Sequence, residues 1–122
     1  MRKESTPRFA GVDVPVRRLV RLLNRLPGCA TNSSCGGHPL PGAGQVHEGF
    51  WYVDLELDET AEGWRTLALL AWLCDEETAT VLTPWTEDPA HGVRFDLRGT
   101  HLSGLTLEAN LSEWLTRRRG RG

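Results

Sequence analysis

The residues best able to do chemistry are concentrated in one short stretch, SSCGGH, at positions 33–38. It places two hydroxyls, a thiol, two glycines and an imidazole in six consecutive positions. A cysteine here can be a nucleophile or a metal ligand, and a histidine can be a base or a second ligand. The glycines can turn successive backbone N–H groups toward one point, which forms a nest for an anion.

A ligand-binding loop is the interpretation that uses most of these residues. The glycine pair would supply the nest, and the hydroxyl and amide groups before it would add polar contacts. We expect the ligand to be small, and either anionic or nucleotide-like. The predicted ligand-binding residues are Asn32, Ser33, Ser34, Cys35, Gly36, Gly37 and His38. The competing structural interpretation is a tight turn of small residues, with the cysteine buried and the histidine facing solvent.

A thiol-dependent catalyst is an alternative. Cys35 and His38 are its candidate catalytic residues, because a neighbouring imidazole activates a thiol. His47, His91 or His101 could also reach the thiol through the fold. Reactive thiols usually lie at a helix N-terminus or beside a cation, and the GGHPLP that follows the cysteine does not start a helix easily.

Zinc is a further alternative, since Cys29, Cys35, His38 and His47 are all of ligand type. Their spacing, C-x5-C-x2-H-x8-H, is not that of a standard zinc ribbon or finger. If residues 29–35 form a strand, a rise of about 3.3 Å per residue separates the two cysteines by about 20 Å. One ion cannot bridge that distance. We therefore expect no metal site, and we expect Cys29 to be a small buried residue.

Length and cysteine content indicate one domain in a reducing compartment. The chain has 122 residues, a common domain size, so we expect one domain over 1–122, with flexible ends at 1–12 and 117–122. Three cysteines, an odd number, argue against a closed disulfide framework. We expect no signal peptide and no membrane-spanning segment, and hence a cytoplasmic protein with reduced thiols.

Charge is distributed unevenly. Positions 1–25 hold seven Lys/Arg against two Asp/Glu, positions 26–92 hold one against eleven, and positions 93–122 hold six against three. The acidic middle opposes a long polyanion. We therefore interpret the arginines of both ends as solvated, and we do not expect a nucleic-acid partner, although those arginines leave that alternative open.

Hydrophobic periodicity predicts the order αββαββα. The expected elements are a helix from an Asp13 cap with Pro15 to Leu26, strands at 29–34 and 50–57, a helix after Thr60, strands at 79–83 and 93–98, and a helix from about Gly104 to Arg118. This order predicts an α/β domain of the α+β type. Its four-stranded, mostly antiparallel sheet carries the helices on one face. Val93, Phe95 and Leu97 are expected to point inward.

The helix after Thr60 is apolar nearly all round. Its predicted buried stripe is Trp64, Leu67, Ala68 and Ala71. A helix with a second apolar face can hold a partner, so we expect a homodimer, and an interaction module is a third class of function. Trp51, Trp64, Trp72 and Trp114 are interpreted as core residues, and Trp85, after Pro84, as a loop residue. The acidic residues Asp54, Glu56, Asp58, Glu59 and Glu62 are interpreted as solvated.

The run LVRLLNRLPGCATNSSCGGH resembles the opening of the wybutosine-synthesizing protein 3 family. In that family a helix leads into a strand that ends in Thr-Ser-Ser-Cys-Ser-Gly-Arg. The run also resembles small bacterial and phage proteins that carry LN-x-LPG and a Ser-Cys-x-Gly-His motif. Ser34, Cys35 and Gly37 match the shared motif, and His38 matches the small proteins but stands where the wybutosine family has arginine.

The wybutosine family methylates a modified guanosine of transfer RNA with S-adenosylmethionine. The resemblance implies a related α/β domain with a functional Ser-Cys-x-Gly loop. This chain is shorter and lacks the later family motifs, so an S-adenosylmethionine-dependent RNA-modifying methyltransferase is the second enzyme alternative. Our main expectation is a small cytoplasmic ligand-binding protein, with its ligand and any cofactor unidentified.

Overall fold

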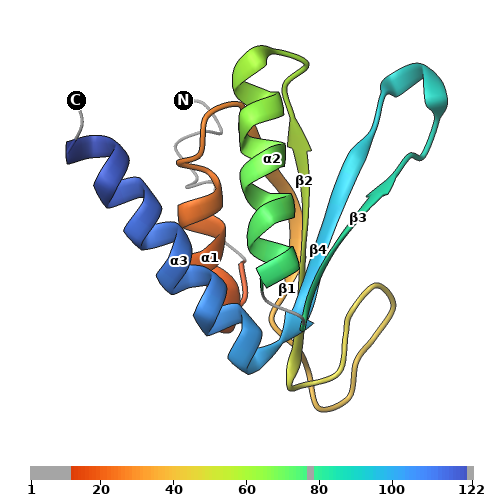
Figure 1. Cartoon of the computed structure of the whole chain (residues 1–122). Helices are drawn as coiled ribbons and strands as arrows, with labels where there is room; N and C mark the ends of the chain where they lie inside the picture. The colour runs from red at the N-terminus through yellow and green to blue at the C-terminus, as the bar shows by residue number, and fades with distance from the viewer. Residues whose placement is uncertain (1–11, 77–78, 121–122) are drawn as a thin grey trace, which may run out of the picture.

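The computed structural model describes residues 12–76 and 79–120, which form three α-helices and one four-stranded antiparallel sheet (Figure 1). The elements are α1 (Val14–Leu23), β1 (Cys29–Cys35), β2 (Phe50–Leu57), α2 (Ala61–Glu76), β3 (Thr80–Trp85), the short 3-10 turn η2 (Pro89–His91), β4 (Arg94–Thr100) and α3 (His101–Gly120). The predicted α+β class and the predicted order αββαββα are confirmed.

The sheet joins two hairpins through their second strands. Its strand order is β1-β2-β4-β3, and each neighbouring pair is antiparallel. Residues opposite each other in such a pair share a face. Trp51, Val53 and Leu55 of β2 and Leu97 of β4 are all buried on one face.

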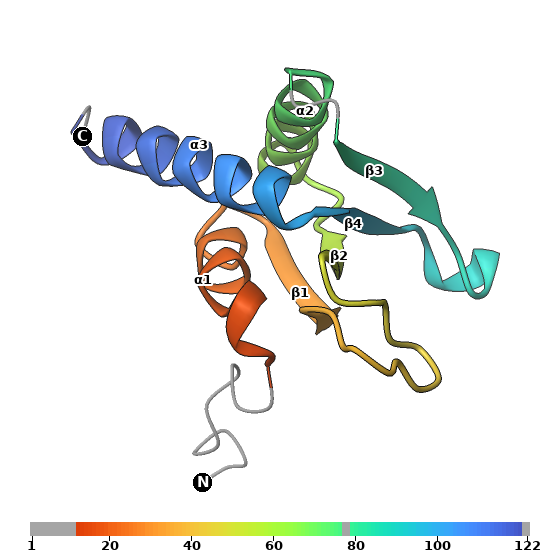
Figure 2. The ribbon, with the colours of Figure 1, turned by 90° about the horizontal axis from the view of Figure 1, so that it is seen from below.

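The helices cover this apolar face, as seen from two directions in Figures 1 and 2. In both views the β1–β2 loop, residues 36–49, and the tip of the β3–β4 hairpin project on the opposite side of the sheet. We call that side the open face. It carries Tyr52 and Asp54 of β2, Trp85 of β3 and Arg98 of β4.

Helices α1 and α3 close the core beside β1 and β2. The buried side chains are Val16, Leu19, Val20, Leu22 and Leu23 of α1, followed by Leu26, and Leu107, Leu111 and Leu115 of α3. Helix α3 begins earlier than predicted, because Ser103 and Thr100 exchange side-chain to backbone hydrogen bonds that start a helix directly after β4. It continues to Gly120, into an end expected to be flexible, whereas 1–11 and 121–122 lie outside the described residues. Among the described helices, none is long and apolar enough to cross a lipid bilayer.

Helix α2 is rotated relative to its predicted orientation. Its buried face consists of Gly63, Thr66, Leu70 and Leu73, so the predicted stripe is wrong. A Cβ on Gly63 would overlap the Asp58 carbonyl, so this glycine lets the start of the helix press against the preceding turn.

The same rotation turns two tryptophans outward. The Thr66 hydroxyl donates to the Pro27 carbonyl at 2.6 Å and fixes the helix on the α1–β1 connection. Trp64 and Trp72 are consequently 68% and 60% exposed, so their interpretation as core residues is wrong. Trp51 is buried as predicted, and Trp114 is partly buried against the core.

Strand β3 is longer than predicted. It continues through Pro84 to Trp85, which is therefore a strand residue and not a loop residue. Proline is tolerated there because β3 is an edge strand. Trp85 Nε1 donates to Asp54 Oδ1 at 2.8 Å, and Asp54 is buried, not solvated as expected. Val93, predicted to point inward, is exposed and precedes β4.

Candidate functional site

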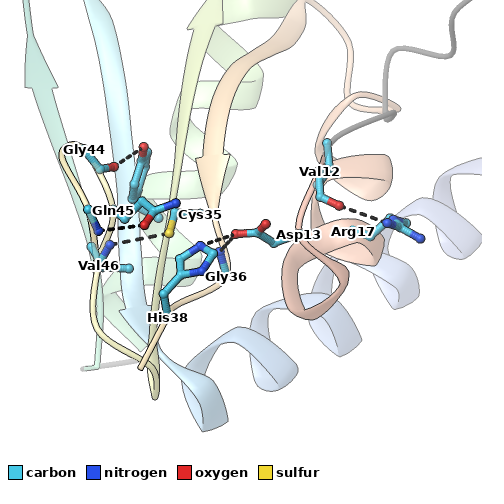
Figure 3. Close-up of polar contacts among 11 residues, drawn as sticks. Val12, Asp13, Arg17, Cys35, Gly36, His38, Gly44, Gln45 and Val46 are labelled. Carbon is cyan, nitrogen blue, oxygen red and sulfur yellow. Dashed lines mark hydrogen bonds and ion pairs between the residues drawn. The ribbon is translucent and has the colours of Figure 1, made fainter. Parts of the chain in front are cut away.

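A carboxylate from the start of α1 joins the predicted loop. One ligand-type atom each from Asp13, Cys35 and His38 lies within 4.8 Å of the others, and Figure 3 shows the three side chains. Asp13 Oδ2 is 3.1 Å from His38 Nε2 and accepts the Gly36 backbone N–H at 2.8 Å. We call these three residues the Asp13–Cys35–His38 cluster.

Sequence reasoning missed Asp13 because it was interpreted as a helix cap. It occupies the cap position, but its side chain makes no capping hydrogen bond. Pro15, two residues later, has no N–H to offer, and the Val16 N–H donates to the Asp13 main-chain carbonyl at 3.1 Å. The Asp13 carboxylate therefore makes its hydrogen bonds to the loop, at Gly36 and His38, and none to the helix backbone. A proline at that helical position is the sequence signal that could have pointed to this role.

The loop backbone fixes the position of His38. Its N–H donates to the Val46 carbonyl, and its carbonyl accepts the Glu48 N–H, both at 2.9 Å. Gly37 makes this turn with φ +96°, and a Cβ there would lie 2.7 Å from the Phe50 carbonyl oxygen. The backbone of His38 is therefore held from both sides, and its imidazole contacts the Asp13 carboxylate.

Cys35 lies beneath the loop at the end of β1. It is 2% exposed, and its Sγ accepts the Val46 N–H at 3.5 Å. Cys35 lies opposite Tyr52 of the neighbouring strand β2. The Tyr52 hydroxyl donates to the Gly44 carbonyl at 2.8 Å. Burial, and then the neighbouring Cys35, raise the pKa of Tyr52, which keeps this hydroxyl a donor. Of the four histidines, His38 is the one in the cluster.

The burial of Cys35 bears on the thiol-catalyst alternative. A nucleophile must be reached by its substrate, and this sulfur is covered by the loop. The other thiols offer no better candidate: burial, with help from Asp58, raises the pKa of Cys29 to about 12, and burial raises that of Cys74 to about 11. All three cysteines are free.

The three predicted ligand-binding residues before Cys35 lie on both faces of the sheet. Asn32 sits at an irregularity in β1, and its Nδ2 donates to Asp54 Oδ2 at 3.4 Å on the open face. Ser33 is exposed and lies opposite Asp54. Ser34 lies opposite the buried Val53, so it belongs to the face covered by the helices. The structure thus brings Cys35, Gly36 and His38 together, leaves Asn32 and Ser33 beside Asp54 on the open face, and turns Ser34 to the other face.

The glycine pair does not leave its first N–H to an external anion. Gly36 donates to the chain's own carboxylate, and a Cβ at this position would lie 3.0 Å from both Asp13 Cβ and Pro15 Cδ. An anion in the loop would have to displace Asp13 and then sit beside its charge. The same arrangement suits a cation, because a carboxylate oxygen, a sulfur and an imidazole nitrogen all lie within 4.8 Å of one another.

A hollow of about 350 Å³ lies where the loop meets the open face. Its lining includes Val46, His47, Phe50, Val81, Arg98 and Thr100. The Arg98 guanidinium lies 5.6 Å from the centre of the Tyr52 ring, and its Nη2 donates to Asp96 Oδ1 at 3.1 Å. That carboxylate raises the pKa of Arg98, so the guanidinium stays charged beside the hollow.

A larger cleft of about 580 Å³ separates the start of α2 from the β3–β4 hairpin. Its acidic lining residues are Glu56, Asp58, Glu59, Glu87 and Asp88. Part of the acidic run interpreted as solvated therefore faces this cleft. The accumulated negative charge disfavours phosphate-bearing ligands there.

No protein-family model, curated protein or solved structure matches this chain. The resemblance to the wybutosine-synthesizing protein 3 family therefore stays a prediction.

Proposed function

We propose that this protein binds a small nucleotide-like ligand in the hollow between the β1–β2 loop and the open face. The observation that carries the proposal is the hollow itself, which adjoins the loop at Val46 and His47. Its volume of about 350 Å³ is at the lower end of the range of small-molecule sites. A single base with its sugar is the size of ligand that such a site accommodates.

The lining has the chemistry that planar bases require. Phe50 is 53% exposed although it is aromatic, and it offers a ring on which a base can stack. Arg98 adds a planar cation at the same wall. The acidic cleft and the occupied Gly36 N–H disfavour a bare anion or a long polyanion, so recognition in this proposal rests on the base.

Thermal unfolding with a panel of nucleosides, nucleoside monophosphates, cyclic nucleotides and S-adenosylmethionine tests the proposal. A bound ligand raises the unfolding midpoint of the native chain. Phe50→Ala should abolish that shift, while Leu105→Ala, an exposed apolar residue on α3, should retain it. The proposal fails if no member of the panel shifts the midpoint, or if Phe50→Ala responds like the native chain.

The same panel addresses the enzyme alternative. Retention of S-adenosylmethionine, and of no nucleotide, would favour the methyltransferase implied by the resemblance. In this proposal the protein works in the cytoplasm, where its three free thiols remain reduced.

A second candidate function, self-association through α2, is favoured by its outward face. Trp64 and Trp72 lie two turns apart with Ala68 between them. A twofold axis near residue 70 would lay Trp72 of one copy over Ala68 of the other. It would also bring Arg65 opposite Asp75, two exposed residues of opposite charge. We propose a homodimer of this antiparallel kind.

Sedimentation equilibrium at micromolar concentration tests the homodimer. Arg65→Glu should weaken the dimer, because it places two negative charges opposite each other. The double change Arg65→Glu with Asp75→Arg should restore the dimer, because the two opposite charges then exchange places. A monomer for the native chain, or equal behaviour of the single and double variants, would overturn this contact.

A further inference from the structure

We propose that the Asp13–Cys35–His38 cluster is a binding site for one zinc ion. This ligand set differs from the one considered on sequence spacing, because Asp13 joins Cys35 and His38, and Cys29 and His47 are not part of it. Cys29 and Cys35 begin and end β1 and cannot share an ion. The site is separate from the hollow proposed for the nucleotide-like ligand, and neither proposal depends on the other.

The distances suit a tetrahedral ion. Zinc binds sulfur at about 2.3 Å and nitrogen or oxygen at about 2.0–2.2 Å, so its ligand atoms lie roughly 3.3–3.8 Å apart. The atoms of the cluster all lie within 4.8 Å of one another, and the pair formed by Asp13 Oδ2 and His38 Nε2 is at 3.1 Å. Small rotations of the three side chains are sufficient to surround an ion.

Both anionic ligand atoms already have backbone donors. Gly36 N–H supports Asp13 Oδ2, and Val46 N–H supports Cys35 Sγ. Outer contacts of this kind orient metal ligands and stabilise their charged forms. His38 is held in place by the backbone bonds described above. The cluster is therefore organised before any ion arrives.

The donor set selects the class of metal. A thiolate and an imidazole favour a borderline-soft ion such as zinc over calcium or magnesium, which prefer oxygen ligands. Binding requires that the thiol lose its proton and that the imidazole be neutral. The carboxylate and the thiolate then balance the two charges of the ion. Arg17, one turn along α1, donates to the Val12 carbonyl and points away from the cluster (Figure 3).

An ion can reach the cluster from the side of Asp13 and His38. The side chains of Asp13 and His38 are each 32% exposed, whereas Cys35 is nearly inaccessible. An ion entering between them would meet the sulfur last. Three protein ligands leave a fourth position for water or an exogenous group, as in zinc sites that are not purely structural.

Titration of the metal-free full chain with Co²⁺ and then Zn²⁺ tests the site. Cobalt should bind one ion per chain with release of the thiol proton and produce a thiolate-to-metal charge-transfer absorption, and zinc should displace the cobalt without further proton release. Cys35→Ser should abolish the absorption. Asp13→Ala and His38→Ala should each weaken zinc binding at least about 100-fold, since loss of an outer-shell partner alone costs about 10- to 100-fold.

Matched controls use residues of the same types outside the cluster. Cys74→Ala and His91→Ala should bind zinc like the native chain. Because a variant that does not fold would also lose the ion, the native zinc complex is measured by X-ray absorption as well, which should report one sulfur among nitrogen and oxygen neighbours. Absence of zinc binding by the native chain, a shell without sulfur, or an unaltered affinity in folded Cys35→Ser would each overturn the proposal.

Discussion

The Asp13 carboxylate and the His38 imidazole are 25 positions apart in sequence and 3.1 Å apart in space. The same carboxylate oxygen accepts the Gly36 N–H. The start of α1 is thereby attached to the loop after β1 by two contacts. The shape of the loop depends on a residue outside it, so substitutions at Asp13 should affect the site and the stability of the fold together.

Asp13→Ala should lower the free energy of unfolding by about 1–2 kcal/mol, because it removes a charge-assisted acceptor from two partly buried donors. Urea unfolding followed by circular dichroism measures the loss. Asp13→Asn should lower the free energy of unfolding by less, since its amide oxygen can still accept the Gly36 N–H. Glu113→Ala, which breaks an exposed ion pair with Arg117, is the control and should change stability by less than about 0.5 kcal/mol. Equal effects of Asp13→Ala and Glu113→Ala would mean that the loop does not depend on Asp13.

The fold could be predicted from the sequence where one periodicity dominated. The stripe of α1 that contains Leu19 and Leu23, and the alternation of Trp51, Val53 and Leu55 in β2, each allow one orientation of their element. Helix α2 is apolar on all sides, so periodicity could not orient it. A tertiary contact that no local pattern encodes, the hydrogen bond from the Thr66 hydroxyl to the Pro27 carbonyl, fixes its orientation.

The site was predicted only in part for a similar reason. The loop residues Cys35 and His38 are three positions apart in sequence, and their types indicated a site. Asp13 is distant in sequence, and its local context offered a sufficient explanation as a cap. Asn32, Ser33 and Ser34 were grouped with the loop because sequence proximity does not show the irregularity in β1 or the alternation of strand faces.

Gly37→Ala should destabilise the protein more than Gly44→Ala. Both glycines have positive φ, +96° and +75°, so an alanine at either position should cost about 1–2 kcal/mol from backbone strain. At Gly37 the new Cβ would also lie 2.7 Å from the Phe50 carbonyl oxygen, whereas at Gly44 it would meet nothing within 4 Å. Thermal unfolding of the two variants compares them directly. A Gly44→Ala loss as large as that of Gly37→Ala would show that the loop yields without strain at Phe50.

Cys35→Ala and Leu23→Ala should show how differently the loop and the core contribute to the free energy of unfolding. Leu23 is fully buried within the main cluster, so its truncation should cost about 2–5 kcal/mol. Cys35 is buried under the loop but outside that cluster, and alanine removes one sulfur that accepts one N–H. Its loss should be about 1 kcal/mol. Chemical denaturation measures both, and a Cys35→Ala effect as large as that of Leu23→Ala would make Cys35 a core residue.

Stability should fall at alkaline pH through Cys29. Burial, and then the charge of Asp58, raise its pKa from 9.0 to about 12 in the folded state. Below about pH 9 the Cys29 thiol is protonated in both the folded and the unfolded chain, so its full contribution to the free energy of unfolding is present. Between about pH 9 and 12 the unfolded chain loses this proton and the folded chain keeps it, so the free energy of unfolding falls as pH rises. A shift of this size corresponds to a loss of up to about 4 kcal/mol.

Urea unfolding at pH values from 8 to 11 tests the role of Cys29, since Cys29→Ala should have a shallower fall than the native chain. Its folded state has no proton to retain at this position, although Cys74, with a pKa raised to about 11 by burial, should leave a residual slope. Leu26→Val weakens the same core without removing a titrating group, so it should lower the whole curve and keep the native slope. If Cys29→Ala and Leu26→Val give curves of the same slope, the alkaline loss of stability arises elsewhere in the chain.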